Sequence, residues 1–134
     1  MDNLPFYGTF LRSDSVEAQA AKTLSRCREQ LKAISKVFDY QMSPRDISLK
    51  NLTTSEQIVR EILAELDDSP YICSLLRSSE EVRANLHQVI DNLCTAADTY
   101  EWPKTNRNRS KTLYSCYREV YRCIYLALDT LPKE

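Results

Sequence analysis

Glycine is almost absent from this chain of 134 residues, which contains a single one, Gly8. β-Sandwiches and β-barrels need many tight turns with positive φ, and glycine is the residue that most often supplies them. A glycine-rich phosphate-binding loop is excluded for the same reason. The scarcity of glycine therefore argues against an all-β fold and against a nucleotide-binding loop, and it favours a helical protein.

The sequence also lacks a long hydrophobic run and a recognisable secretory signal. No stretch approaches the roughly 20 apolar residues that a membrane-spanning helix needs. Asp2 stands where a signal peptide carries Lys or Arg, and Pro5 and Gly8 interrupt the apolar residues that follow. We therefore expect a cytoplasmic protein that does not insert into a membrane.

The residue combinations that usually carry catalysis or bind metals are missing as well. His87 is the only histidine, so a site built on paired histidines is excluded, and no catalytic motif surrounds it. The cysteines form no CxxC pair, and we expect them to serve as small buried hydrophobic residues. They are Cys27, Cys73, Cys94, Cys116 and Cys123. We accordingly expect no enzyme activity, no cofactor and no metal.

What the sequence does contain is helical periodicity between widely spaced prolines. In the first long segment the apolar residues recur every three or four positions, which predicts a helix with one apolar face. They are Val16, Ala20, Leu24, Cys27, Leu31, Ile34 and Phe38. We expect this helix to begin at Ser13, Asp14 or Ser15 and to reach about Tyr40.

Three further helices and one short helix follow from capping signals and similar periodicity. Thr53 with Glu56 predicts a capping box for the second helix. Ser69 before Pro70 predicts the start of a short helix, and Ser78 with Glu81 predicts the start of the next long one. The last helix lies between Pro103 and Pro132. We therefore predict an all-α, single-domain antiparallel bundle of four main helices plus one short helix, with the bundle domain at 13–134.

Aromatic residues gather in two places outside this expected core pattern. Residues 1–12 form an N-terminal aromatic arm, which we expect either to fold back across the bundle or to dock into another chain. In the last helix a stripe of tyrosines lies beside the apolar face, so this helix is either central to the bundle or part of an interface. These candidate protein-binding residues are Phe6, Tyr7, Phe10, Tyr114, Tyr117, Tyr121 and Tyr125.

Positive charge concentrates just before the last helix, although the net charge of the whole chain is only −1. Residues 51–101 carry 3 basic and 10 acidic side chains, whereas residues 102–134 carry 7 basic and 3 acidic ones. Ion pairs between these two segments, within one chain or between two chains, would neutralise their opposite charges. Four cations at the start of the last helix also form a candidate anion-binding site. They are Lys104, Arg107, Arg109 and Lys111.

Two functions from different classes remain open at this point. The first is a non-enzymatic helical bundle that binds another protein, possible partners including a second copy of the chain, and acts as an adaptor, regulator or assembly factor. Tyrosine suits such a surface because it buries a large area at little cost in side-chain entropy. The alternative is binding of nucleic acid or another polyanion through residues 104–111. The overall pI of 5.9 argues against that alternative.

Overall fold

The computed structural model describes residues 4–39, 47–76 and 78–131, without the side chains of residues 4–15, Pro70 and Cys73. In this part of the chain every regular element is helical, as the sparse glycine predicts. The helices are α1 (Leu4–Val37), α2 (Leu49–Asp68), α3 (Pro70–Ser74), α4 (Ser79–Tyr100) and α5 (Arg109–Thr130).

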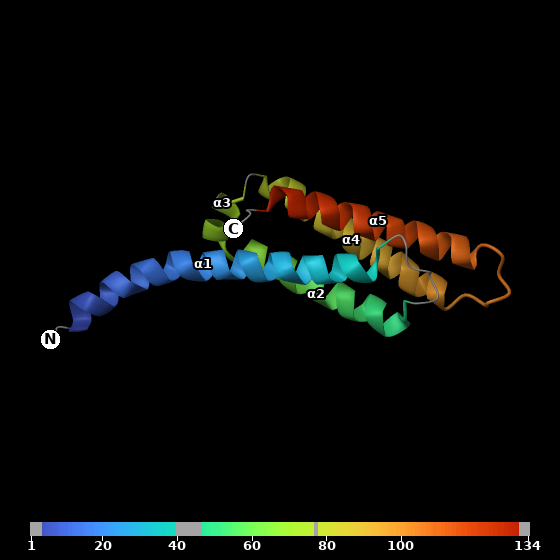
Figure 1. The fold of residues 1–134 in the computed structure, drawn as a ribbon, viewed down its shortest axis with the longest axis horizontal. Coiled ribbons are helices and arrows are strands. Elements are labelled where there is room, and N and C mark those ends of the chain that lie inside the picture. The colour runs from blue at the N-terminus through green and yellow to red at the C-terminus, as the bar shows by residue number, and fades with distance from the viewer. Residues whose placement is uncertain (1–3, 40–46, 77, 132–134) are drawn as a thin grey trace.

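The four long helices pack side by side in an up-down-up-down arrangement (Figure 1). The second helix, α2, contacts α1 and α4, and α5 also contacts both α1 and α4. Each long helix therefore has two neighbours around a shared interior, while α3 packs against α2 and α1. The predicted all-α, single-domain antiparallel bundle with one short extra helix is confirmed.

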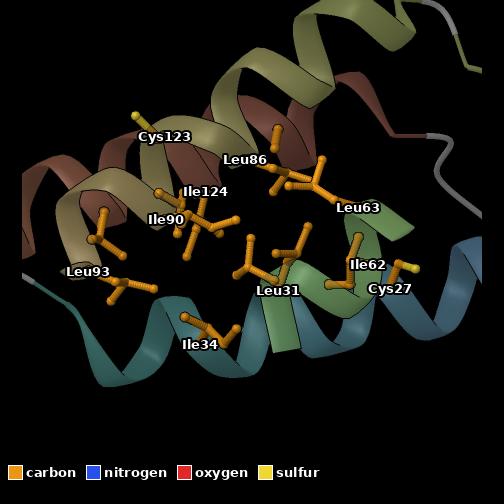
Figure 2. Close-up of a cluster of buried hydrophobic side chains, with 14 of the residues drawn as sticks. Cys27, Leu31, Ile34, Ile62, Leu63, Leu86, Ile90, Leu93, Cys123 and Ile124 are labelled. Carbon is orange, nitrogen blue, oxygen red and sulfur yellow. The ribbon is translucent and has the colours of Figure 1, made fainter. Parts of the chain in front are cut away.

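One continuous hydrophobic core fills the interior of the bundle. Figure 2 shows side chains from all four long helices meeting there, including Leu31, Ile62, Leu86 and Ile124. The apolar face predicted for the first helix is buried from Ala20 onward. Its first member, Val16, is 52% exposed.

The first helix starts earlier than the sequence predicted. It begins at Leu4 and continues through Ser13–Ser15, so the expected start at those capping residues was wrong. Figure 1 shows the N-terminal part of α1 extending past the other helices rather than folding back across them. The predicted arm thus overlaps a continuous helix from residue 4, while the side chains of Phe6, Tyr7 and Phe10 lie outside the described residues.

The cap of α2 also differs from the prediction. Ser48, not Thr53, is the N-cap, and its hydroxyl accepts a hydrogen bond of 3.1 Å from the backbone N–H of Asn51. The Asn51 side chain accepts in return from the Ser48 N–H at 3.0 Å, which completes a capping box. Glu56 instead forms an ion pair with Arg60 one turn later.

The other predicted helix starts are confirmed. The Ser69 hydroxyl accepts from the Ile72 N–H at 3.2 Å, at the start of α3. The Ser78 hydroxyl accepts from the Glu81 N–H at 3.3 Å, at the start of α4. Each of these bonds satisfies a backbone donor that has no partner within its helix.

Three consecutive residues of α1 tie it to its neighbours through polar contacts. Arg26 forms an ion pair with Glu65 of α2, and the Cys27 thiol lies 3.7 Å from the same carboxylate. Arg28 donates to the backbone carbonyl of Leu128 near the end of α5, at 3.3 Å. The Arg26–Glu65 pair thus joins a cation of α1 to the acidic segment 51–101 within one chain.

No helix in residues 4–39, 47–76 and 78–131 combines the length and the apolar character required to cross a membrane.

Candidate functional site: the outer face of the last helix

Helix α5 carries two different apolar faces. The inner face points into the bundle and is buried along its whole length. Its members are Leu113, Cys116, Tyr117, Val120, Cys123, Ile124 and Ala127. The inner face packs α5 into the bundle. It does not account for the tyrosines on the other side of α5.

Tyr117 belongs to the core, which separates it from the predicted tyrosine stripe. It is only 4% exposed, and its ring packs against Phe38 of α1 with the ring centroids 5.6 Å apart. Its hydroxyl is buried without a hydrogen-bond partner. Burial raises the pKa of this hydroxyl to about 12, with a smaller contribution from Tyr100. Because its side chain is buried in the core, Tyr117 is not available to a binding partner, and its assignment as an interface residue was wrong.

The other three tyrosines of the stripe lie together around a shallow groove of about 520 Å³. Tyr125 is 65% exposed, Tyr114 is 37% exposed, and Tyr121 is half-buried. The neighbouring Leu126 is also 40% exposed. We call this surface the outer face of α5. It consists of Tyr114, Arg118, Glu119, Tyr121, Arg122, Tyr125 and Leu126.

The outer face carries charge as well as aromatic area. Arg122 donates to the Glu119 carboxylate at 2.8 Å, and this hydrogen bond lowers the pKa of Glu119. Both side chains are exposed, so the pair contributes little to the stability of the fold. Arg118 is exposed and has no ion-pair partner in the part of the chain that the structure describes. The groove therefore has one cation in excess.

A smaller cavity of about 170 Å³ continues the groove toward α1. Its lining includes Arg28 of α1 together with Tyr125 and Leu128 of α5. The hydrogen bond from Arg28 to the Leu128 carbonyl joins the α1 side of this cavity to α5. The two cavities share Tyr125, so the most exposed tyrosine of α5 lies between them.

The basic segment before α5 is not assembled into one site. Arg109 donates through Nε and a terminal nitrogen to the Tyr100 carbonyl, at 3.3 and 2.8 Å, and its guanidinium lies 5.0 Å from the centroid of the Tyr100 ring. It therefore caps the end of α4. The other three candidate cations, Lys104, Arg107 and Lys111, are exposed.

Cysteine, histidine and metal chemistry are not concentrated at any point of the described chain. Cys27, Cys116 and Cys123 are buried, as predicted, whereas Cys94 is only half-buried, and the side chain of Cys73 lies outside the described residues. Burial raises the pKa of the Cys27 thiol to about 11. His87 is exposed on α4. No group of three or more His, Cys, Asp or Glu side chains among the described residues could hold a metal ion.

Comparison with known proteins finds no matching family model, no matching curated protein and no matching solved structure. The function must therefore be argued from the outer face itself.

Sequence reasoning found the tyrosines of this face but missed its other members. Arg118, Glu119, Arg122 and Leu126 were not among the candidate residues. Arg118 lies one helical turn from both Tyr114 and Tyr121, so helical spacing places it on their side of α5. Grouping residues by position on the helix, rather than by side-chain type, would have found it.

Proposed function

We propose that this protein is a non-enzymatic interaction module that binds another protein through the outer face of α5 and acts as an adaptor, regulator or assembly factor. The observation that carries the proposal is the exposure of Tyr125, Leu126 and Tyr114 around a groove of about 520 Å³. Large apolar side chains that gather on a surface typically mark an interaction site.

The composition of the face supports the same proposal. Tyrosine and arginine dominate the energetics of protein–protein interfaces, and both occur here at adjacent positions. A tyrosine such as Tyr125 can bury a large area while it restricts only two side-chain torsions. Complete burial of an exposed side chain of this size contributes about 1.5–3 kcal/mol. The outer face therefore offers the chemistry of a binding site without needing any rearrangement of the core.

The proposal assigns no catalytic group. The best nucleophiles in the chain are cysteines, and burial raises the pKa of the thiols of Cys27, Cys116 and Cys123. A thiol with a raised pKa is mostly protonated at neutral pH and is a poor nucleophile.

We also propose that the interaction takes place in the cytoplasm. Cys27, Cys94, Cys116 and Cys123 are unpaired thiols, and such thiols persist in reducing compartments.

The test is affinity capture from native lysate, in nuclease-treated and untreated halves, followed by mass spectrometry. The double variant Tyr125→Ala/Leu126→Ala removes the most exposed apolar side chains of the outer face. The matched control is Tyr71→Ala/Leu75→Ala, because these residues on α3 are exposed to similar extents, 40% and 42%. We expect a nuclease-resistant partner that the first variant loses and the control retains. A partner retained by both variants contradicts the proposal.

A second candidate function, the binding of nucleic acid or another polyanion, rests on the exposure of Lys104, Arg107 and Lys111. It predicts that captured molecules disappear after nuclease treatment and that binding weakens steeply with salt. Arg107→Glu/Lys111→Glu should then abolish capture. Arg109 is already engaged with Tyr100, so this candidate has three free cations rather than four among the residues first proposed for it.

A further inference from the structure

The spacing of the outer face indicates which shape of partner fits it. Tyr114, Arg118, Tyr121 and Tyr125 are separated by four, three and four residues. This is the spacing of a heptad seam, which lies in a straight line along a helix when a second helix packs against it. The seam is about 17 Å long, or about three helical turns. A single amphipathic helix is the element that matches such a line.

The charge at the middle of the seam indicates the chemistry of that helix. Arg118 stands between Tyr114 and Tyr121, so a helix that covers these tyrosines also covers the guanidinium. A cation removed from water without a counter-ion is strongly destabilising, whereas a carboxylate can accept two parallel hydrogen bonds from arginine. Arg118 forms no ion pair among the described side chains, and Glu119, which interacts with it electrostatically, is already paired with Arg122, so a carboxylate paired to Arg118 would come from the partner.

A second copy of the same face does not meet this requirement. Two outer faces in contact would bring together four arginines, Arg118 and Arg122 from each chain, and only two glutamates, Glu119 from each chain. Both glutamates are already paired with Arg122. Like charges brought together in an interface disfavour that pairing.

We propose that the outer face of α5 is a docking groove for an acidic amphipathic helix of another protein, with an Asp or Glu at the partner's central seam position paired to Arg118. Apolar residues of the partner one turn to either side pack on Tyr114 and on Tyr121, Tyr125 and Leu126. This inference rests on the proposed interaction function and adds the class of partner.

The test uses two synthetic amphipathic peptides of about three heptads with leucine at the seam positions. One carries glutamate at the central seam position and the other carries lysine there. Fluorescence anisotropy with the full chain measures both affinities. We expect the glutamate peptide to bind at least about tenfold more tightly, the ratio that a difference of 1.4 kcal/mol produces.

Charge reversal provides the decisive comparison. Arg118→Glu should reverse the preference, so that the variant binds the lysine peptide more tightly. This gain of binding cannot arise from unfolding. Lys50→Glu makes a similar charge change on an exposed position of α2 and should leave the original preference intact. Equal affinity for the two peptides, or no binding of either, overturns the inference.

Other occupants of the groove give distinguishable results. Binding of wild-type protein to phosphatidylserine vesicles but to neither peptide, lost in Arg118→Glu, identifies a membrane surface and overturns the inference. A dimer in analytical ultracentrifugation that Tyr125→Ala dissociates identifies a second copy and overturns it equally. If lysate capture depends on Tyr125 and Leu126 but is unchanged by Arg118→Glu, the interaction function stands and the acidic-helix inference fails.

Discussion

Removal of the buried hydroxyl of Tyr117 should stabilise the protein. The hydroxyl lies in the core without a hydrogen-bond partner, while the ring packs against Phe38. Tyr117→Phe keeps the ring and its packing and deletes only the unsatisfied oxygen. A buried polar group without a partner costs about 1–3 kcal/mol, and the small void left by one atom offsets part of that gain.

The expected net gain in the free energy of unfolding is about 1 kcal/mol. For a chain of this size, that gain raises the melting temperature by about 3–5 °C. Chemical denaturation and thermal melts followed by circular dichroism measure both quantities. Tyr125→Phe is the matched control, because an exposed hydroxyl contributes within about 0.5 kcal/mol. A loss of stability of 1 kcal/mol or more in Tyr117→Phe would show that the hydroxyl has a partner and refute the reasoning.

The same hydroxyl makes a specific contribution to the pH dependence of stability. Burial raises its pKa in the folded protein to about 12 from the ordinary value of 10.0, so its ionisation does not affect stability below pH 10 and lowers stability as the pH rises toward 12. Between pH 9 and pH 11 this loss amounts to about 1 kcal/mol. Tyr117→Phe should therefore lose that much less stability than the wild type across this interval. Identical pH profiles would contradict the burial of the hydroxyl.

Two further predictions concern helix ends. Arg109→Ala should lower the free energy of unfolding by about 1–2 kcal/mol, because it removes a charged hydrogen bond and an aromatic contact at the end of α4. In the same denaturation assay, Arg107→Ala at an exposed position should change the free energy of unfolding by less than about 0.5 kcal/mol. Ser48→Ala should cost about 1 kcal/mol as a lost N-cap, and Thr53→Ala should cost clearly less. The reverse order would restore Thr53 as the cap of α2.

Most of the fold follows from periodicity that the sequence displays directly. The seam from Ala20 to Phe38 is buried as predicted, and the starts of α3 and α4 carry the expected serine caps. Two starts were missed: α1 continues through Ser13–Ser15 to begin at Leu4, and α2 is capped by Ser48 rather than Thr53. Ser48 is preferred to Thr53 because Asn51 closes a reciprocal pair with it, so α2 gains an additional turn.

The candidate site was predicted less completely than the fold. The tyrosine stripe was visible in the sequence, but its division into core and surface was not, because Tyr117 lies between the two faces of α5. Packing against Phe38, far away in the sequence, decides its burial. Arg109 was likewise assigned to an anion site, since only the path of the chain brings it back to the Tyr100 carbonyl.

The most direct test of the binding surface is covalent footprinting of the tyrosines with tetranitromethane, with and without the captured partner. In the free protein, Tyr125 at 65% exposure should react readily and Tyr117 at 4% should not. Addition of the partner should protect Tyr125 and Tyr114 while Tyr71 on α3 remains reactive. Protection of Tyr71 with Tyr125 still reactive would place the interface elsewhere and contradict the assignment of the outer face of α5.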